Sequence, residues 1–219
     1  CFDCPVKPGE GDHGHTELTR THAWMPQAYS PQTGLVYIPV QELPGLIGEG
    51  QSGGGEIAAG MGVTLIPEVE LPGGHKSYLK AWNPATQSEA WKIELPGTWP
   101  AGIMASAGGL VFQGQMDGKF VARDAKSGKE LWSFKAQSPI VGAPISYRMN
   151  GKQYVTVLTG AGGQGSGMQT IGNQAFRTDY RFPRHVLTFA LGGKDRLPAF
   201  TPPALVPPAD PTYKEDSAR

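Results

Sequence analysis

The sequence predicts an all-β fold, a β-propeller in which each repeat carries a tryptophan at a fixed place. The 219 residues include 31 glycines and 20 prolines but only 17% charged residues, a composition typical of many turns and short strands. Residues 81–91 and 122–132 are two copies of one motif set 41 positions apart, in which Trp91 matches Trp132. A repeat of roughly 40 to 45 residues is typical of propeller blades, each of which is a small sheet.

Each copy of the motif has the pattern of a β-hairpin. Asn83 in the first copy and Asp124 in the second begin a turn, because their short side chains can bond backbone two residues further on. Residues 119–122 and 131–134 alternate at period two on either side of the second turn, which predicts two paired strands. Trp132 then lies on the outer strand, where its N–H is expected to reach a backbone carbonyl of the next sheet. Two unrelated hairpins that each carry a tryptophan are the alternative.

Three further apolar runs, at residues 28–39, 107–114 and 150–158, predict an inner strand in each of three blades. Their continuous apolar character fits sheets that neighbouring blades cover on both faces. A last strand is expected at residues 185–191. These units make roughly three to four blades, whereas closed propellers usually have about four to eight. We therefore expect the chain to be one part of a larger propeller or to close with another chain.

The remaining segments predict loops and a tail. Residues 1–21 are rich in Gly, Pro and His without a period and are expected to form a loop before a partial propeller at 22–198. Residues 45–62 are glycine-laden and predict a surface excursion. The glycines at 160–167 would let backbone approach a ligand or another strand closely. Residues 199–219 are rich in proline and predict an extended tail.

Charge and cysteine usage narrow the possible partners. The formal net charge is zero with no basic run, so nucleic acid and anionic membrane surfaces are poor candidates, and no apolar run approaches the roughly 20 residues of a membrane span. Haem c attachment at Cys1 and Cys4 would need a histidine where the chain has Pro5. Four alternatives are open for this end of the chain: a disulfide, an irregular terminus, a lipidated Cys1, or a zinc site completed by His13 and His15.

The motif at residues 122–132, together with residues 24–39 and 108–118, resembles the alcohol dehydrogenases that depend on pyrroloquinoline quinone (PQQ). The resemblance covers about residues 22–198 and matches the C-terminal part of such an enzyme, so this chain would supply about half of an eight-bladed ring. It implies alcohol oxidation in the bacterial periplasm, with PQQ and a calcium ion on the propeller axis and a cytochrome c as electron acceptor. The family's aspartate base and calcium ligands lie upstream of the matched region. The resemblance therefore assigns no catalytic residue and no metal ligand to this chain.

The resemblance places four residues at the cofactor site, namely Ala23, Trp24, Trp99 and Val141. Trp24 retains the tryptophan of the family's Asn-Trp pair, while Ala23 stands where the family has an asparagine that donates to the quinone oxygens. Trp99 keeps the ring of the family's Trp-Asn-Gly-Gly segment, and Val141 lies in a segment that brings backbone near the cofactor. A core or docking ring is an equal alternative for Trp99, and an ordinary strand position is one for Val141.

Three small residues, Ala23, Ala101 and Ala161, predict a substrate cavity wider than in enzymes of small alcohols. The stretch 192–198 and the tail resemble the linker to a fused cytochrome domain in quinohaemoproteins, yet the chain has no CxxCH motif. Haem c is therefore not expected on this chain, and the electron acceptor would be a separate protein or a domain outside it. A non-catalytic propeller that binds partner proteins, of the outer-membrane assembly type, is the alternative function.

Overall fold

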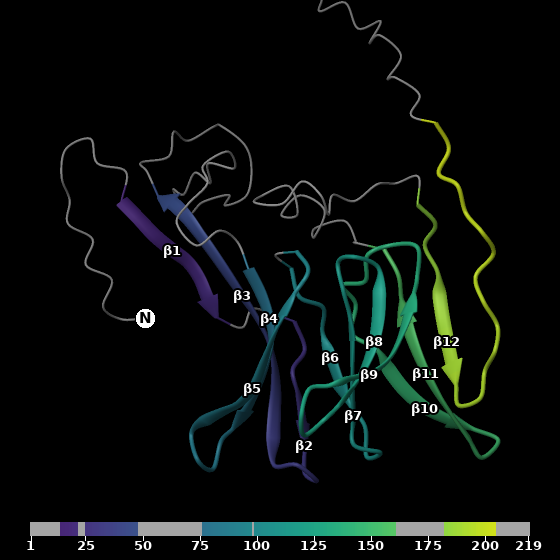
Figure 1. The fold of residues 1–219 in the computed structure, drawn as a ribbon, viewed down its shortest axis with the longest axis horizontal. Coiled ribbons are helices and arrows are strands. Elements are labelled where there is room, and N and C mark those ends of the chain that lie inside the picture. Colours follow the sequence, from purple (N-terminus) through teal and green to yellow (C-terminus); the bar gives the residue numbers. More distant parts are fainter. Residues whose placement is uncertain (1–13, 22–24, 48–75, 98, 161–181, 205–219) are drawn as a thin grey trace, which may run out of the picture.

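The computed structural model describes residues 14–21, 25–47, 76–97, 99–160 and 182–204. These residues form twelve β-strands in three sheets that lie side by side along the sequence (Figure 1). All strand pairs within the sheets are antiparallel. The described part of the chain contains no helix, and so no helix there that could cross a membrane. The all-β prediction is confirmed for these residues.

In the first sheet, two separate strands pair with the same side of β3. The sheet continues from β3 (Leu35–Ile47) through β4 (Lys76–Asn83) to β5 (Ser88–Leu95). Along the free side of β3, β2 (Ala28–Ser30) pairs with the beginning of that strand and β1 (Gly14–Thr21) with its end. β1 and β2 therefore lie side by side with successive parts of the same strand, β3.

Two predictions about this region are wrong in part. Residues 14–21, expected as the end of a loop, form β1, and residues 45–47, expected at the start of a surface excursion, continue β3. Both errors have the same reason: these two stretches pair with each other, so each supplies the hydrogen bonds that the other needs. The rest of 1–21 and of 45–62 lies outside the described residues.

The second sheet is a regular four-stranded blade of β6 (Ile103–Ala105), β7 (Leu110–Gly114), β8 (Lys119–Asp124) and β9 (Glu130–Lys135). The predicted hairpin at its outer side is confirmed as β8 and β9.

The third sheet has three described strands, β10 (Ile145–Met149), β11 (Lys152–Leu158) and β12 (Val186–Ala190). The strand expected at 185–191 is confirmed as β12. The three apolar runs predicted as inner strands are β3, β7 and β11, which are second in their sheets, because a short strand precedes each of them.

The turns of the two motif copies are built alike. The Asn83 Oδ1 atom accepts hydrogen bonds from the N–H groups of Ala85 and Thr86, at 3.0 and 3.3 Å. Asp124 Oδ1 accepts from the N–H of Ser127 at 2.8 Å and from its hydroxyl at 2.7 Å. The Ser127 hydroxyl and then its N–H hold the pKa of Asp124 below the usual range. The turn residues singled out in the sequence therefore act as predicted.

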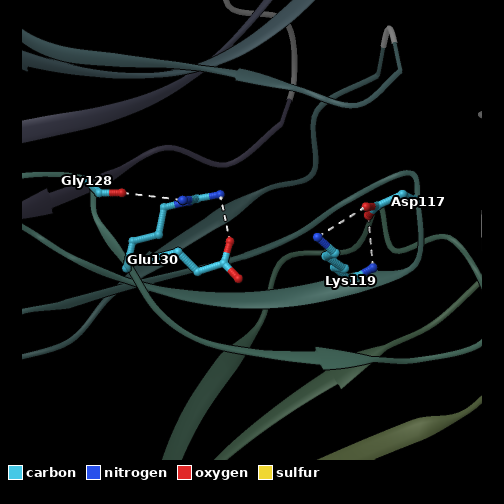
Figure 2. Close-up of polar contacts among 5 residues, drawn as sticks. Asp117, Lys119, Gly128 and Glu130 are labelled. Atoms are coloured by element: carbon cyan, nitrogen blue, oxygen red, sulfur yellow. Dashed lines mark hydrogen bonds and ion pairs between the residues drawn. The ribbon is translucent and has the colours of Figure 1, made fainter.

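Charged side chains brace the loops of the second sheet (Figure 2). The Arg123 guanidinium donates to the Gly128 carbonyl at 3.4 Å and lies 3.7 Å from the Glu130 carboxylate. Burial lowers the pKa of Arg123, and Glu130 opposes that shift. Asp117 accepts the N–H of Lys119 at 3.1 Å in the neighbouring turn. These contacts hold the two ends of β8.

One carbonyl joins the first sheet to the second. Ala125 O accepts a hydrogen bond from Trp91 Nε1 at 3.3 Å and another from the Tyr37 hydroxyl at 2.9 Å. Both donors belong to the first sheet, whereas Ala125 follows β8 of the second sheet and is buried. Burial raises the pKa of the Tyr37 hydroxyl. The contact that the motif predicts for its tryptophan is thus present at Trp91.

The second tryptophan makes ring contacts instead. Trp132 meets Phe120 and Phe189 edge-on, with ring centroids 6.2 and 5.2 Å apart, and so bridges β9 to the third sheet. Between the second and third sheets lies a core that includes Phe120, Val155 and Val157. Each sheet thus packs on the next one along the chain.

The other face of the third sheet is open among the described residues. All five residues of β10 are exposed, and the apolar side chains of Ile145, Leu158 and Val186 are each more than half exposed. The residues after β12 as far as 204 form neither helix nor strand, in line with the extended segment expected from 199. These residues contact the rest of the chain: Gln137 Nε2 donates to the Pro198 carbonyl at 2.7 Å, and the rings of Phe182 and Phe200 lie with centroids 5.9 Å apart.

Candidate functional site

Loops of all three sheets gather at one end of the strands. Residues 25–27 lead into β2, residues 99–102 into β6 and residues 136–144 into β10, while residues 115–118 connect β7 to β8. Antiparallel pairing places the start of β6 beside the end of β7 and the start of β10 beside the end of β11, while the start of β2 lies beside Tyr37 within β3. We call these four segments the loop junction.

A buried apolar cluster forms the centre of the loop junction. Met25, Trp99 and Met116 are at most 4% exposed, and partly buried Val141 packs against them. Each of the four comes from a different segment, so the cluster exists only when the three sheets lie together. Trp99 supplies its largest flat surface, because an indole ring buries more area than any other side chain.

Backbone hydrogen bonds tie the segments across the sheets. Ile103 N–H donates to the Pro26 carbonyl at 2.9 Å, which links the second sheet to the segment that leads into β2 of the first sheet. Gly102 N–H donates to the Val141 carbonyl at 3.4 Å, which links the second sheet to the loop before the third. Ile140 N–H donates to the Gln115 carbonyl at 3.0 Å. The junction is therefore fixed by backbone as well as by side chains.

Two glycines allow these close approaches. A Cβ atom on Gly102 would lie 2.7 Å from the Cβ of Ala143 and 2.8 Å from the Cδ of Pro26. A Cβ on Gly114 would overlap the side chain of Ile140. Since real Cβ contacts are longer than this, any side chain at these positions would push the loops apart. Neither glycine needs an unusual φ, so close packing is the reason for both.

The structure brings together two of the four predicted site residues. Trp99 and Val141 meet in the loop junction, although 42 positions separate them in the chain. Ala23 and Trp24 lie outside the described residues, next to Met25. Ala101 is completely buried, and Ala161 also lies outside the described residues, so the wider cavity stays a prediction.

Sequence reasoning missed the two methionines and Gln113. Met25 follows Trp24 directly and Met116 follows the β7 run, so both stood within the quoted motifs without a feature that marked them. Gln113 is 1% exposed, and its Nε2 donates to the Ala101 carbonyl at 2.9 Å. A polar residue inside an apolar run was the one available signal for it.

The described residues of the junction offer little acid–base chemistry. None of the cluster residues Met25, Trp99, Met116 and Val141 can titrate, and no group of three potential metal ligands occurs among the described residues. The centre of the junction is therefore a buried apolar cluster with backbone polar groups beside it.

Comparison with known proteins identifies the repeat. Residues 80–155 match the β-propeller domain of glucose, ethanol and alcohol dehydrogenases that use PQQ. The chain is also 40% identical over 216 residues to the 1-butanol dehydrogenase (cytochrome c) of Thauera butanivorans. The chain belongs to the quinoprotein alcohol dehydrogenase family. The predicted resemblance and the predicted β-propeller are confirmed.

Other members of the quinoprotein alcohol dehydrogenase family match a similar span. The chain is 39% identical over 192 residues to the quinohaemoprotein alcohol dehydrogenase ADH IIB of Pseudomonas putida. These two relatives match over 90% and 85% of this chain, but the matched part is only 30% and 26% of their own length. The chain thus spans less than a third of the curated relatives that it matches.

A solved quinohaemoprotein alcohol dehydrogenase has a similar fold over the matched part of the chain. The structure of the Comamonas testosteroni enzyme superposes with a TM-score of 0.66 at 33% identity, over 82% of this chain and 27% of that one. The ADHIIG structure from Pseudomonas putida gives the same TM-score of 0.66 at 28% identity, over 91% of this chain.

Proposed function

We propose that this chain is part of a PQQ-dependent dehydrogenase that oxidises an alcohol to an aldehyde or ketone and passes the electrons to a cytochrome c. Two relatives support this: one is named 1-butanol dehydrogenase (cytochrome c), and the other is named quinohaemoprotein alcohol dehydrogenase ADH IIB. The proposal includes a calcium ion at the cofactor and a periplasmic location, both of which follow from the family resemblance alone.

The observation that carries the proposal is the position of Trp99. Its buried ring lies where loops of three neighbouring sheets converge, with Val141 on the same cluster. The blades of a propeller surround a central channel, and we infer that the loops that lead into β2, β6 and β10 face one end of it. A ring at this place can form one wall of an axial site.

The described residues fit the ring of PQQ but not its carboxylates. The cluster of Trp99, Val141 and the two methionines is apolar, as the surroundings of a planar ring are, although Val141 is the member that is only partly buried in this chain. None of the four carries a charge that could pair with a carboxylate. When bound, PQQ would supply the acceptor for the two electrons and the hydrogen of the alcohol. The residues of this chain would bind that ring, orient it and exclude water from one side.

The open face of the third sheet supports the need for more polypeptide. β10 has no neighbour on one side among the described residues, and Ile145, Leu158 and Val186 expose their apolar side chains there. Edges and faces of this kind are normally covered. We therefore expect the rest of the propeller, in the same or a second polypeptide, to pack on this face.

The test is reconstitution of the protein in its native assembly. Protein depleted of cofactor is titrated with PQQ in the presence of calcium, and alcohol-dependent reduction of cytochrome c is measured. We expect reduction to need all of PQQ, calcium and alcohol. Binding of PQQ without any oxidation of primary or secondary alcohols would refute the proposed reaction, and absence of PQQ binding would leave the non-catalytic propeller as the better account.

The role of Trp99 is tested separately. Trp99→Leu should weaken PQQ binding about threefold to tenfold, the loss expected when one aromatic contact is removed. The control is Trp132→Leu, since Trp132 is 41% exposed and lies away from the loop junction. Equal PQQ affinity of the Trp99→Leu variant and the wild type would show that Trp99 is a core ring only.

A further inference from the structure

The buried amide of Gln113 is out of place in a blade core. Its side chain is 1% exposed, on β7. Among the described residues no donor reaches its Oε1 atom, while Nε2 donates to the Ala101 carbonyl at 2.9 Å. An amide oxygen buried without a partner costs stability, so a purely structural role would favour an apolar residue.

The first sheet shows that such an apolar residue is sufficient. In the strand registers, Tyr37 pairs with Ala81 as Phe112 pairs with Ala122, which makes Ile38 the counterpart of Gln113. The same position in a neighbouring blade thus holds isoleucine. The blade repeat itself does not require glutamine at this position, although Ile38 is only partly buried where Gln113 is buried. The contacts of the amide give a reason for Gln113.

The amide contacts a peptide unit at the centre of the loop junction. The Ala101 carbonyl and the Gly102 N–H belong to one planar peptide group. Gln113 Nε2 holds the carbonyl end, and the N–H end donates to the Val141 carbonyl at 3.4 Å. When this peptide plane is fixed, the backbone before it and after it is fixed in direction. Trp99 lies two residues before Ala101, and the Gly102 N–H is hydrogen-bonded to Val141.

Close packing around the Ala101–Gly102 peptide leaves it no room to move. Gly102 has no room for a Cβ atom, because Ala143 and Pro26 lie within 2.8 Å of that point. The loops before the first and third sheets therefore press on this peptide from two sides, and Gln113 holds it from within the second sheet.

We propose that Gln113 is a positioning residue for the PQQ site. Its buried amide holds the Ala101–Gly102 peptide and thereby sets the position of Trp99 and Val141 against the ring of the cofactor. This inference rests on the proposed function, because it concerns the same site. Gln113 is not in itself a contact of the cofactor.

The test compares stability with cofactor affinity in the native assembly. Gln113→Leu keeps the bulk of the side chain and removes the hydrogen bond. We expect its PQQ affinity, measured by equilibrium dialysis, to fall about threefold to tenfold, which is the effect of one hydrogen bond. Its thermal midpoint should change little, because removal of the unpaired Oε1 offsets the loss of the donor to the buried Ala101 carbonyl. The matched control is Gln153→Leu, on the exposed part of β11.

The outcomes separate this inference from the proposed function. A wild type that binds PQQ and a Gln113→Leu variant that binds it equally well would overturn the positioning role. A loss of affinity that only accompanies a lower thermal midpoint would also overturn it, because general destabilisation then explains both. A wild type that binds no PQQ would refute the proposed function itself. If Gln113→Leu fails to fold, Gln113→Met keeps the length of the side chain. This variant must then lose PQQ affinity without a lower thermal midpoint.

Discussion

The joint acceptor at Ala125 makes a quantitative prediction about how blades hold together. Tyr37→Phe removes the 2.9 Å hydrogen bond and should lower the free energy of unfolding by about 1 kcal/mol. Trp91→Phe removes the 3.3 Å hydrogen bond and part of the ring, with a loss of about 1 kcal/mol. In either single variant the buried carbonyl keeps one donor.

The double variant should lose more than the sum of the two. With both donors gone, the Ala125 carbonyl stays buried without a partner, which costs about 1 to 3 kcal/mol in proteins. We therefore expect an excess of at least about 1 kcal/mol in the double-mutant cycle. The assay is urea denaturation followed by far-ultraviolet circular dichroism, analysed at a common m-value.

A control and a refuting result are available for this cycle. Tyr29→Phe removes a hydroxyl from a side chain that is 58% exposed, and it should change stability by less than about 0.5 kcal/mol. Losses in the cycle that add to within about 0.5 kcal/mol would refute the shared acceptor, since independent sites behave in this way.

Two further predictions concern the turns. Gly128→Ala should lower the thermal midpoint more than Gly151→Ala: both glycines have a φ near +75°, but a Cβ on Gly128 would lie 2.9 Å from the Trp91 ring, whereas Gly151 has open space. Asp124, whose pKa is lowered in the folded state, contributes stability above its unfolded pKa of about 3.9 and loses it as the pH falls through the folded value. Asp124→Asn should therefore flatten the acid limb of the thermal midpoint against pH, and Asn83→Asp should steepen it.

Each of these has a clear contrary result. Equal losses for the two glycine variants would mean that strain at positive φ, and not contact with the tryptophan, explains the effect. Acid limbs of the same slope in wild type and Asp124→Asn would mean that other carboxylates dominate the pH dependence.

Local features of the sequence were enough to predict the repeat. The turns at Asn83 and Asp124 depend on hydrogen bonds within three residues, and the hairpin strands depend on alternation over a few residues. Trp91 and Trp132 recur at a constant spacing, which requires only that the two blades share a structure. These features are determined by neighbours in the chain, so the sequence alone reveals them.

The loop junction depends on contacts that no local pattern reports. Met25 meets Met116 across 91 positions, and Gly102 is small because Pro26 and Ala143 approach it from other sheets. The pairing of β1 with the end of β3 likewise joins segments that look irregular when read singly. Trp99 and Val141 were found through the family resemblance and not through spacing, whereas their meeting is a result of the fold.

The most direct test of the account is the cofactor content of the native protein. The protein is purified in its native assembly, its subunits are weighed by intact mass spectrometry, and the denatured sample is extracted and examined by absorbance. We predict that the chain is accompanied by further propeller sequence, in the same or another polypeptide, and that a quinone absorbing in the near ultraviolet is released. A folded monomer of this chain alone, free of quinone and unable to take up PQQ, would contradict the account.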